Sequence, residues 1–179
     1  MFLTTHAAAG LAISRIVNDP LAVFSLSFAS HFVLDFIPHG DEHLYGDYLQ
    51  PSPHRFRRAV AVNAVDLIAL IGLAVWAVRQ PLSPSTQLML IGILGSIVPD
   101  FLSHFFPLLH QRLSWLFLVR WIYAATKPTG LRYVVRGQDW LHRISHHRII
   151  RTDVPLTVGV VMQIGLVAAF FALVRSSPP

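Results

Sequence analysis

Five apolar stretches run through this chain and leave too little polar surface for an ordinary water-soluble domain. They cover 2–17, 21–38, 59–78, 88–109 and 154–174. Charged residues make up 13% of the sequence, whereas about 25% is typical of soluble domains. The third and fifth stretches reach the roughly 20 residues that a helix needs to cross a hydrocarbon layer of about 30 Å. The chain is therefore predicted to be an all-α integral membrane helical bundle of about five transmembrane helices.

The organisation along the chain is predicted to be a single integral membrane domain over 1–179. We expect two helical hairpins, a basic loop and a final helix, in that order (2–38, 59–107, 108–153 and 154–174). Within the loop, 113–125 is apolar and aromatic but short, and Arg120 interrupts it. We expect an interfacial or re-entrant helix there, since a span needs more residues. If this segment did cross, the histidines that follow it would lie on the opposite side of the membrane.

The distribution of lysine and arginine predicts which side of the membrane each loop occupies. With five spans, the loops around 39–58 and 110–153 share one side, and they carry 11 of the 14 basic residues. An excess of lysine and arginine in loops is typical of the cytoplasmic side. We therefore expect a multi-pass protein of the inner (plasma) membrane whose long loops face the cytoplasm.

Histidines and aspartates recur where these apolar stretches meet that predicted side. His31, Asp35 and His39 are spaced at i, i+4 and i+8, and Asp100 and His104 repeat the carboxylate–imidazole pair. Residues four apart on a helix lie about 5–6 Å apart at Cβ, close enough to share one ion. Because the chain has no cysteine, any metal must be held by imidazole and carboxylate, which suits zinc, manganese, iron or nickel.

The predicted topology aims further histidines at the same face, His6 from the first stretch and two more from the basic loop. The predicted metal ligands are His6, His31, Asp35, His39, Asp100, His104, His142 and His146. Simpler interpretations stay open for each motif. These are local hydrogen bonds at a helix end for 31–39, a helix cap for Asp100, and a basic loop touching lipid headgroups for 142–147. The repeated Asp-Phe-x-x-His also indicates a possible duplicated helical hairpin.

Three further residues are assigned to catalysis. Asp66, in the third apolar stretch, is predicted to be a general base, a ligand, or a partner that orients an imidazole. Arg143 and Arg148 are interleaved with the loop histidines and are predicted to hold an anionic group by paired hydrogen bonds. They would neutralise charge that develops on a phosphate during reaction.

Three motifs carry a resemblance to a known family: Thr5-His6, Pro99-Asp100 and His142-Arg143-Ile144-Ser145-His146. With them the chain resembles the predicted membrane-bound metal-dependent hydrolases, the YdjM-like integral membrane proteins of bacteria and archaea. The resemblance implies a metal-dependent hydrolase of the membrane, with the histidines and the aspartate of these motifs as ligands.

Together these patterns predict a hydrolase that uses zinc or manganese and acts on an ester or phosphoester at the cytoplasmic membrane face. The expected partners are membrane lipid and an anionic small-molecule or lipid substrate. No motif for nucleic-acid binding is present, so no nucleic-acid partner is expected. Two alternatives stay open: a metal or proton transporter, because ionisable residues in apolar helices also mark transport sites, and a structural membrane protein.

Overall fold

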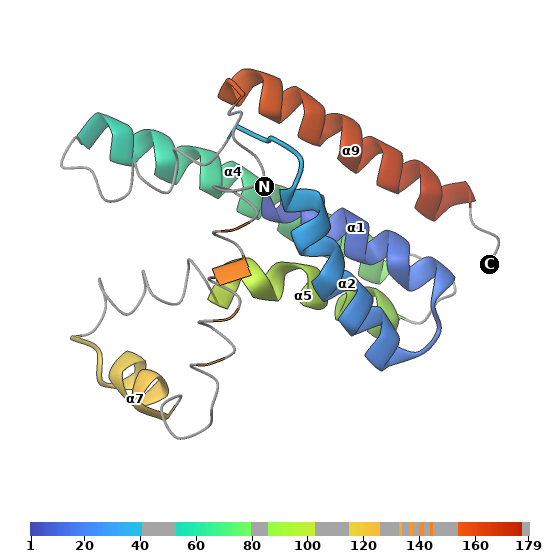
Figure 1. Ribbon diagram of the computed structural model, residues 1–179, viewed down its shortest axis with the longest axis horizontal. Helices are drawn as coiled ribbons and strands as arrows, with labels where there is room; N and C mark the ends of the chain where they lie inside the picture. The colour runs from blue at the N-terminus through green and yellow to red at the C-terminus, as the bar shows by residue number, and fades with distance from the viewer. Residues whose placement is uncertain are drawn as a thin grey trace.

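The computed structural model describes residues 1–40, 53–79, 86–102, 115–125 and 154–176, together with residues 133, 137, 140, 141 and 144. In this part of the chain the regular structure is helical, and no strand occurs among the described residues, so the predicted all-α class is confirmed for them (Figure 1). The helices are α1 (Leu3–Ile16), α2 (Pro20–Asp35), α4 (Pro53–Arg79), α5 (Thr86–Asp100), α7 (Phe117–Ala125) and α9 (Leu156–Ser176).

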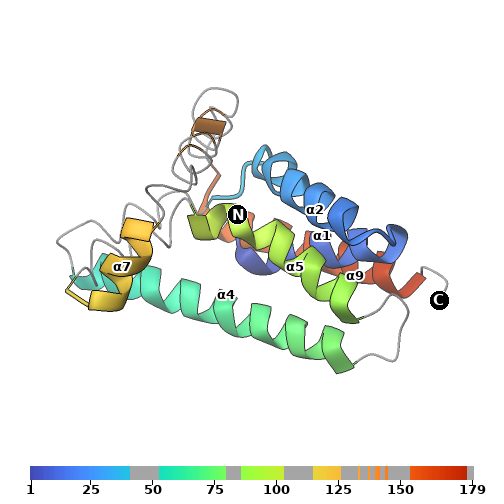
Figure 2. The same cartoon turned by 90° about the horizontal axis from the view of Figure 1, so that it is seen from below.

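Helix α1 is the centre of the bundle, and α2, α4, α5 and α9 pack around it (Figures 1 and 2). Its residues from Thr5 to Leu11 are all buried, as expected of a helix covered on every side. Contacts between apolar side chains of four helices form the core: Ala7, Ala8, Leu11, Leu70, Leu73, Ala77, Met89, Ile93 and Val174. Helices α1, α4 and α9 run in one direction and α2 and α5 in the other.

Small residues bring α1 and α5 into backbone contact. Gly10 and Ser14 on α1 face Gly92 and Ser96 on α5, each pair four residues apart. A Cβ atom built on Gly10 would overlap the carbonyl of Gly92, and one built on Gly92 would overlap the carbonyl of Gly10. Small residues at this spacing are typical of close helix crossings in membrane proteins. The crossing sets the register in which the two antiparallel helices meet.

The helix ends partly follow the predictions. Asp19 caps α2, its Oδ1 accepting a hydrogen bond of 2.7 Å from the backbone nitrogen of Ala22, and Pro20 occupies the first turn. Helix α2 ends at Asp35 rather than at 38, because a residue before a proline disfavours helical backbone. Helix α4 begins at Pro53, six residues earlier than predicted.

The helical pattern of α5 changes directly after the Pro99-Asp100 motif. Helix α5 continues through Pro99 to Asp100, and only Phe101 and Leu102 adopt the wider π-helical turn. A proline lacks the backbone N–H that would bond the carbonyl one turn earlier, and the hydrogen-bond pattern changes directly after it. The rest of the predicted 88–109 stretch lies outside the described residues.

Among the described helices, two are long and apolar enough to cross a membrane, α4 and α9. Helices α2 and α5 are apolar but shorter. Helix α7 is drawn apart from the bundle in Figure 1, and it carries exposed large side chains at Phe117, Leu118 and Trp121. By length and hydropathy, the described part of the structure thus supports two transmembrane helices, whereas the sequence predicts about five.

Candidate metal centre

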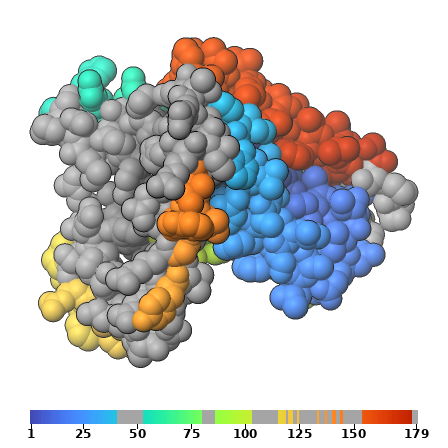
Figure 3. All heavy atoms as spheres, in the orientation of Figure 1, coloured from blue at the N-terminus to red at the C-terminus, as the bar shows by residue number. Residues whose placement is uncertain are grey.

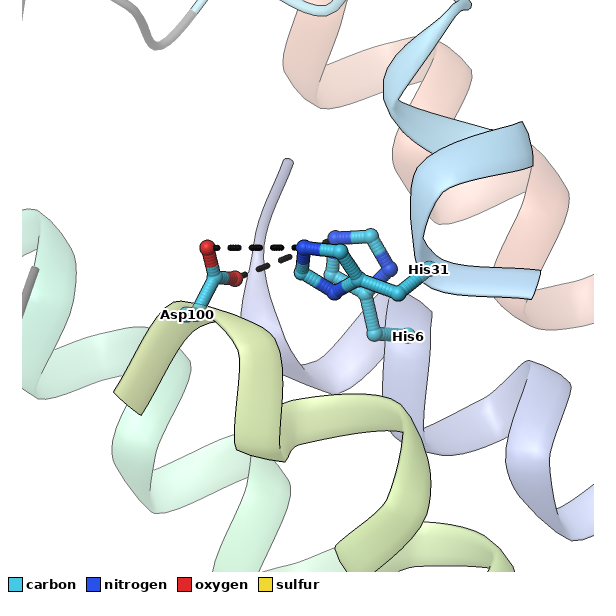
Figure 4. A group of neighbouring side chains, drawn as sticks. All are labelled: His6, His31 and Asp100. Atoms are coloured by element: carbon cyan, nitrogen blue, oxygen red, sulfur yellow. Dashed lines mark ion pairs between the residues drawn. The ribbon is translucent and has the colours of Figure 1, made fainter. Parts of the chain in front are cut away.

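Three helices bring one ionisable side chain each to the same end of the bundle. His6 comes from α1, His31 from α2 and Asp100 from α5 (Figure 4). His6 precedes Gly10 by four residues, and Asp100 follows Ser96 by four. Because these small residues form the antiparallel crossing of α1 and α5, the next turn of each helix places His6 opposite Asp100.

The ligand atoms of these three residues lie within 4.8 Å of one another. His6 Nε2 is 3.9 Å from Asp100 Oδ2, and His31 Nε2 is 3.8 Å from Asp100 Oδ1. The two imidazole rings stack with their centroids 4.0 Å apart. Figure 4 shows the carboxylate of Asp100 directed at the two imidazoles. Three donors of the kinds that bind divalent metals therefore converge on one point.

A second carboxylate lies against the same two imidazoles. Asp35 Oδ1 is 3.2 Å from His6 Nε2, and Asp35 Oδ2 is 3.1 Å from His31 Nε2. The side chains of His6, His31 and Asp35 are fully buried, whereas that of Asp100 is 16% exposed. We refer to these four residues, His6, His31, Asp35 and Asp100, as the His–Asp centre. Burying two carboxylates is costly unless positive charge accompanies them.

The donor set and its spacing fit a divalent ion. The donor–acceptor distances within the centre run from 3.1 to 3.9 Å. Neighbouring ligands of a tetrahedral zinc ion with bonds of about 2.0–2.1 Å are separated by about 3.3–3.4 Å. His6 is fully buried, and neither of its ring nitrogens makes a hydrogen bond to a described residue. The group could therefore hold a metal ion.

The orientation of His31 supports this interpretation. Its Nδ1 lies 2.9 Å from the backbone oxygen of Ser96. A carbonyl oxygen only accepts, so Nδ1 carries a proton and donates, and Nε2 is the ring nitrogen that faces the two carboxylates. Metal-ligating histidines usually donate their second ring nitrogen to a carbonyl or a carboxylate in this way.

His39 is close to the centre but belongs to a different set of contacts. Its Nδ1 donates to the backbone oxygen of Ile37 over 2.7 Å, and its Nε2 lies 2.7 Å from the Met1 nitrogen. That nitrogen is in turn 3.3 Å from Asp35 Oδ1. His39 is therefore separated from the converging ligand atoms by Met1, and its predicted role as a ligand stays a prediction.

Asp66 lies beside the N-terminus of α1 rather than among the four residues of the centre. Its Oδ2 accepts a hydrogen bond of 2.8 Å from the backbone nitrogen of Leu3, and its Oδ1 accepts one of 3.1 Å from that of Thr4. The first N–H groups of a helix have no partner within the helix, and a carboxylate satisfies them well. The structure therefore gives Asp66 a capping role, and the predicted role as a base stays untested.

Gln163 is a buried polar residue that the sequence analysis did not single out. Its Oε1 accepts from the backbone nitrogen of Phe2 over 2.7 Å, and its Nε2 donates to the backbone oxygen of His39 over 3.3 Å. It is the one strongly polar residue in the middle of the apolar helix α9. This isolated position in the sequence could have identified it as a buried hydrogen-bonding residue. We refer to Asp66 and Gln163 as the capping cluster, because together they hold the start of α1 one turn before His6.

The segment after α2 also packs tightly against α9. Gly159 is in backbone contact with His39, and a Cβ atom at Gly159 would overlap the His39 carbonyl. Gly40 adopts a positive φ of 72°, a conformation that glycine reaches without strain. Figure 3 shows the residues that follow α2 lying against α9 on the visible face. These contacts fix the end of α2, which carries Asp35.

The remaining predicted site residues, His104, His142, Arg143, His146 and Arg148, lie outside the described residues. Of the predicted ligands that the structure describes, His6, His31, Asp35 and Asp100 are brought together, and His39 lies beside them. Comparison of the chain with models of known protein families, with curated proteins and with solved structures gives no match.

Proposed function

We propose that this chain is a membrane-embedded metal-dependent hydrolase whose metal is held by the His–Asp centre. The observation that carries the proposal is the convergence of two imidazole nitrogens and the Asp100 carboxylate, from three helices, within 4.8 Å. His6 and Asp100 also stand in two of the motifs that resemble the YdjM-like hydrolases. That resemblance supports hydrolysis as the class of reaction.

The membrane setting is part of the proposal. Helices α4 and α9 have the length and hydropathy of spans, and α1, α2 and α5 run alongside them in alternating directions. We propose that all five are embedded and that α7 lies at the membrane surface through its exposed aromatic side chains. The excess of basic residues in the long loops supports a cytoplasmic position for the end that carries the His–Asp centre.

The residues of the His–Asp centre would have distinct roles in such a reaction. His6, His31 and Asp100 would hold the ion, and Asp35 would be a further ligand, because its two oxygens face the same Nε2 atoms. Such an ion supplies Lewis-acid chemistry and lowers the pKa of a water molecule from about 15.7 toward 7. Asp100, the partly exposed member, marks the side on which an ester or phosphoester would approach. Arg143 and Arg148 remain candidates for neutralising an anionic substrate.

The test is hydrolysis by purified protein in detergent, loaded with zinc or with manganese, on long-chain p-nitrophenyl acyl esters and phosphodiesters. We expect activity that a chelator removes and the metal restores, and a loss of more than about tenfold in His31→Ala. Asp19→Ala is the matched control, because Asp19 is an exposed carboxylate at the opposite end of the same helix. Equal activity in His31→Ala and the control would refute the proposal.

A metal transporter is the second candidate, and the burial of the centre favours it. His6, His31 and Asp35 have no exposed side-chain surface, as expected of a site that must be closed to at least one side. Proteoliposomes that take up zinc through the wild-type chain but not through His31→Ala, without hydrolysing any ester tested, would select this candidate over the hydrolase.

A further inference from the structure

The position of the His–Asp centre along the bundle can be measured against α4. The first turns of α4 carry exposed arginines, the last of them Arg58. From Val60 onward the exposed side chains of α4 are mostly large and apolar, and they continue to Val78. Asp66 lies eight residues beyond Arg58, which is about 12 Å along the helix axis. The N-terminus of α1, held by Asp66, therefore lies well inside the apolar band of α4.

Helix α9 gives a second, independent measure of the same depth. Gln163, which binds the backbone nitrogen of Phe2, lies seven residues after the start of α9 at Leu156, or about 10 Å along the axis. Exposed apolar residues lie on both sides of it, at Val158, Val161 and Ile164. His6 is further along α1 than Phe2, in the direction shared with α4 and α9. His6 therefore lies deeper in the apolar band than the start of α1, whose depth Asp66 and Gln163 give.

Exposed side chains beside the ligands on α2 and α5 are consistent with this depth. Phe36 directly follows Asp35, and Phe101 directly follows Asp100; both side chains are more than 40% exposed. Large exposed apolar side chains are rare in contact with water unless they cover an interface or meet lipid. Apolar surface thus continues past the ligand residues toward the end of the bundle.

We infer that the His–Asp centre lies within the hydrocarbon layer, about 10–15 Å below the headgroup level, and takes a bilayer-dissolved substrate with an uncharged reacting group, a carboxylic ester. The inference rests on the proposed function and narrows its substrate class. Two aspartates and the attacking hydroxide would already balance the charges of one divalent ion and of the Met1 ammonium, which pairs with Asp35 over 3.3 Å. A phosphodiester at this depth would add an uncompensated negative charge, which is costly in hydrocarbon, whereas an acyl ester adds none.

The depth is tested without reference to activity. Because the chain has no cysteine, single cysteines can be placed at Val60, Ile68 and Val78, whose exposed side chains do not contribute to the core. Each variant is spin-labelled in liposomes, and its collision rates with oxygen and with a water-soluble nickel chelate are compared. We expect Ile68→Cys to be the deepest of the three and shielded from the chelate. Equal access of the chelate at Ile68 and Val60 would overturn the inference.

The substrate class is tested with three p-nitrophenyl probes in proteoliposomes loaded with zinc: a long-chain acyl ester, a short-chain water-soluble acyl ester, and a long-chain phosphodiester. We expect the long-chain acyl ester to be cleaved at least about tenfold faster than either of the others. A faster phosphodiester, or a faster short-chain ester, overturns the inference and leaves the hydrolase proposal standing. Zinc retention by His31→Ala at the wild-type level would instead overturn the hydrolase proposal itself.

Discussion

The His–Asp centre and the capping cluster lie within one helical turn of each other, yet they are built in opposite ways. In the capping cluster, Asp66 and Gln163 accept hydrogen bonds from three successive backbone N–H groups at the start of α1. In the His–Asp centre, the carboxylates of Asp35 and Asp100 face imidazole nitrogens instead. Both groups are polar and largely buried, so burial alone does not separate them.

The partners of a buried polar group therefore indicate whether its role in an apolar bundle is structural or functional. A carboxylate that satisfies the free N–H groups of a helix end stabilises the fold and has its acceptors occupied. Carboxylates that face imidazoles need compensating positive charge, from a protonated ring, from the Met1 ammonium beside Asp35 or from a metal ion. We therefore expect substitutions in the capping cluster to lower stability and substitutions in the His–Asp centre to remove metal.

The largest effect on stability is expected from Asp66→Ala. It would leave the partly buried backbone nitrogens of Leu3 and Thr4 without their acceptors, at up to about 1–3 kcal/mol each, or at most about 2–6 kcal/mol together. Thermal denaturation in detergent measures this loss. Asp66→Asn keeps one acceptor oxygen and should lose less. Unchanged stability in both variants would remove the distinction between the two clusters.

Metal binding is expected to stabilise the fold by a somewhat smaller amount. An ion that binds only the folded state, at 100 times its Kd, adds about 2.7 kcal/mol. The zinc-dependent rise in the denaturation temperature should disappear in Asp100→Asn, which keeps the shape of the side chain but not its charge. A zinc-dependent rise of the same size in Asp100→Asn would show that the ion binds elsewhere.

Gln163→Leu should cost less than the loss of Asp66, because one backbone donor rather than two loses its acceptor. We expect about 1–3 kcal/mol, measured by thermal denaturation. Gln87→Leu is the matched control, since Gln87 is an exposed glutamine near the start of α5. Equal losses in the two variants would contradict the role that we assign to Gln163.

Asp19→Ala should give the smallest change, about 1 kcal/mol, because it removes an exposed helix cap. Its metal content should equal that of the wild type, as determined by elemental analysis of the purified protein. A loss of metal in this variant would mean that metal content follows general stability rather than the His–Asp centre.

Part of the site could be predicted from the sequence, since it depends on spacing within one helix. His31 and Asp35 contact each other because residues four apart share a helix face. The proximity of His6 and Asp100 followed from the expectation that the ends of successive helices share one side of a membrane. The cap of α2 by Asp19 is equally local.

The rest depends on which helices meet and in what register. The crossing of α1 and α5 depends on the contact between Gly10 and Gly92. These two residues are far apart in the sequence, and no local pattern shows that their helices pack together. Asp66 was predicted to act in chemistry because a buried carboxylate is unusual. Its capping role depends on the end of α1 lying beside it, and no local pattern in α4 encodes that.

The metal content of purified protein tests the central claim most directly. After dialysis against trace zinc or manganese, elemental analysis should find about one divalent ion per wild-type chain, and less than about a tenth of that in His6→Ala and in Asp100→Ala. Asp66→Asn should keep the wild-type content per folded chain. An ion-free wild type, or variants of His6 and Asp100 that retain the ion, would contradict the account.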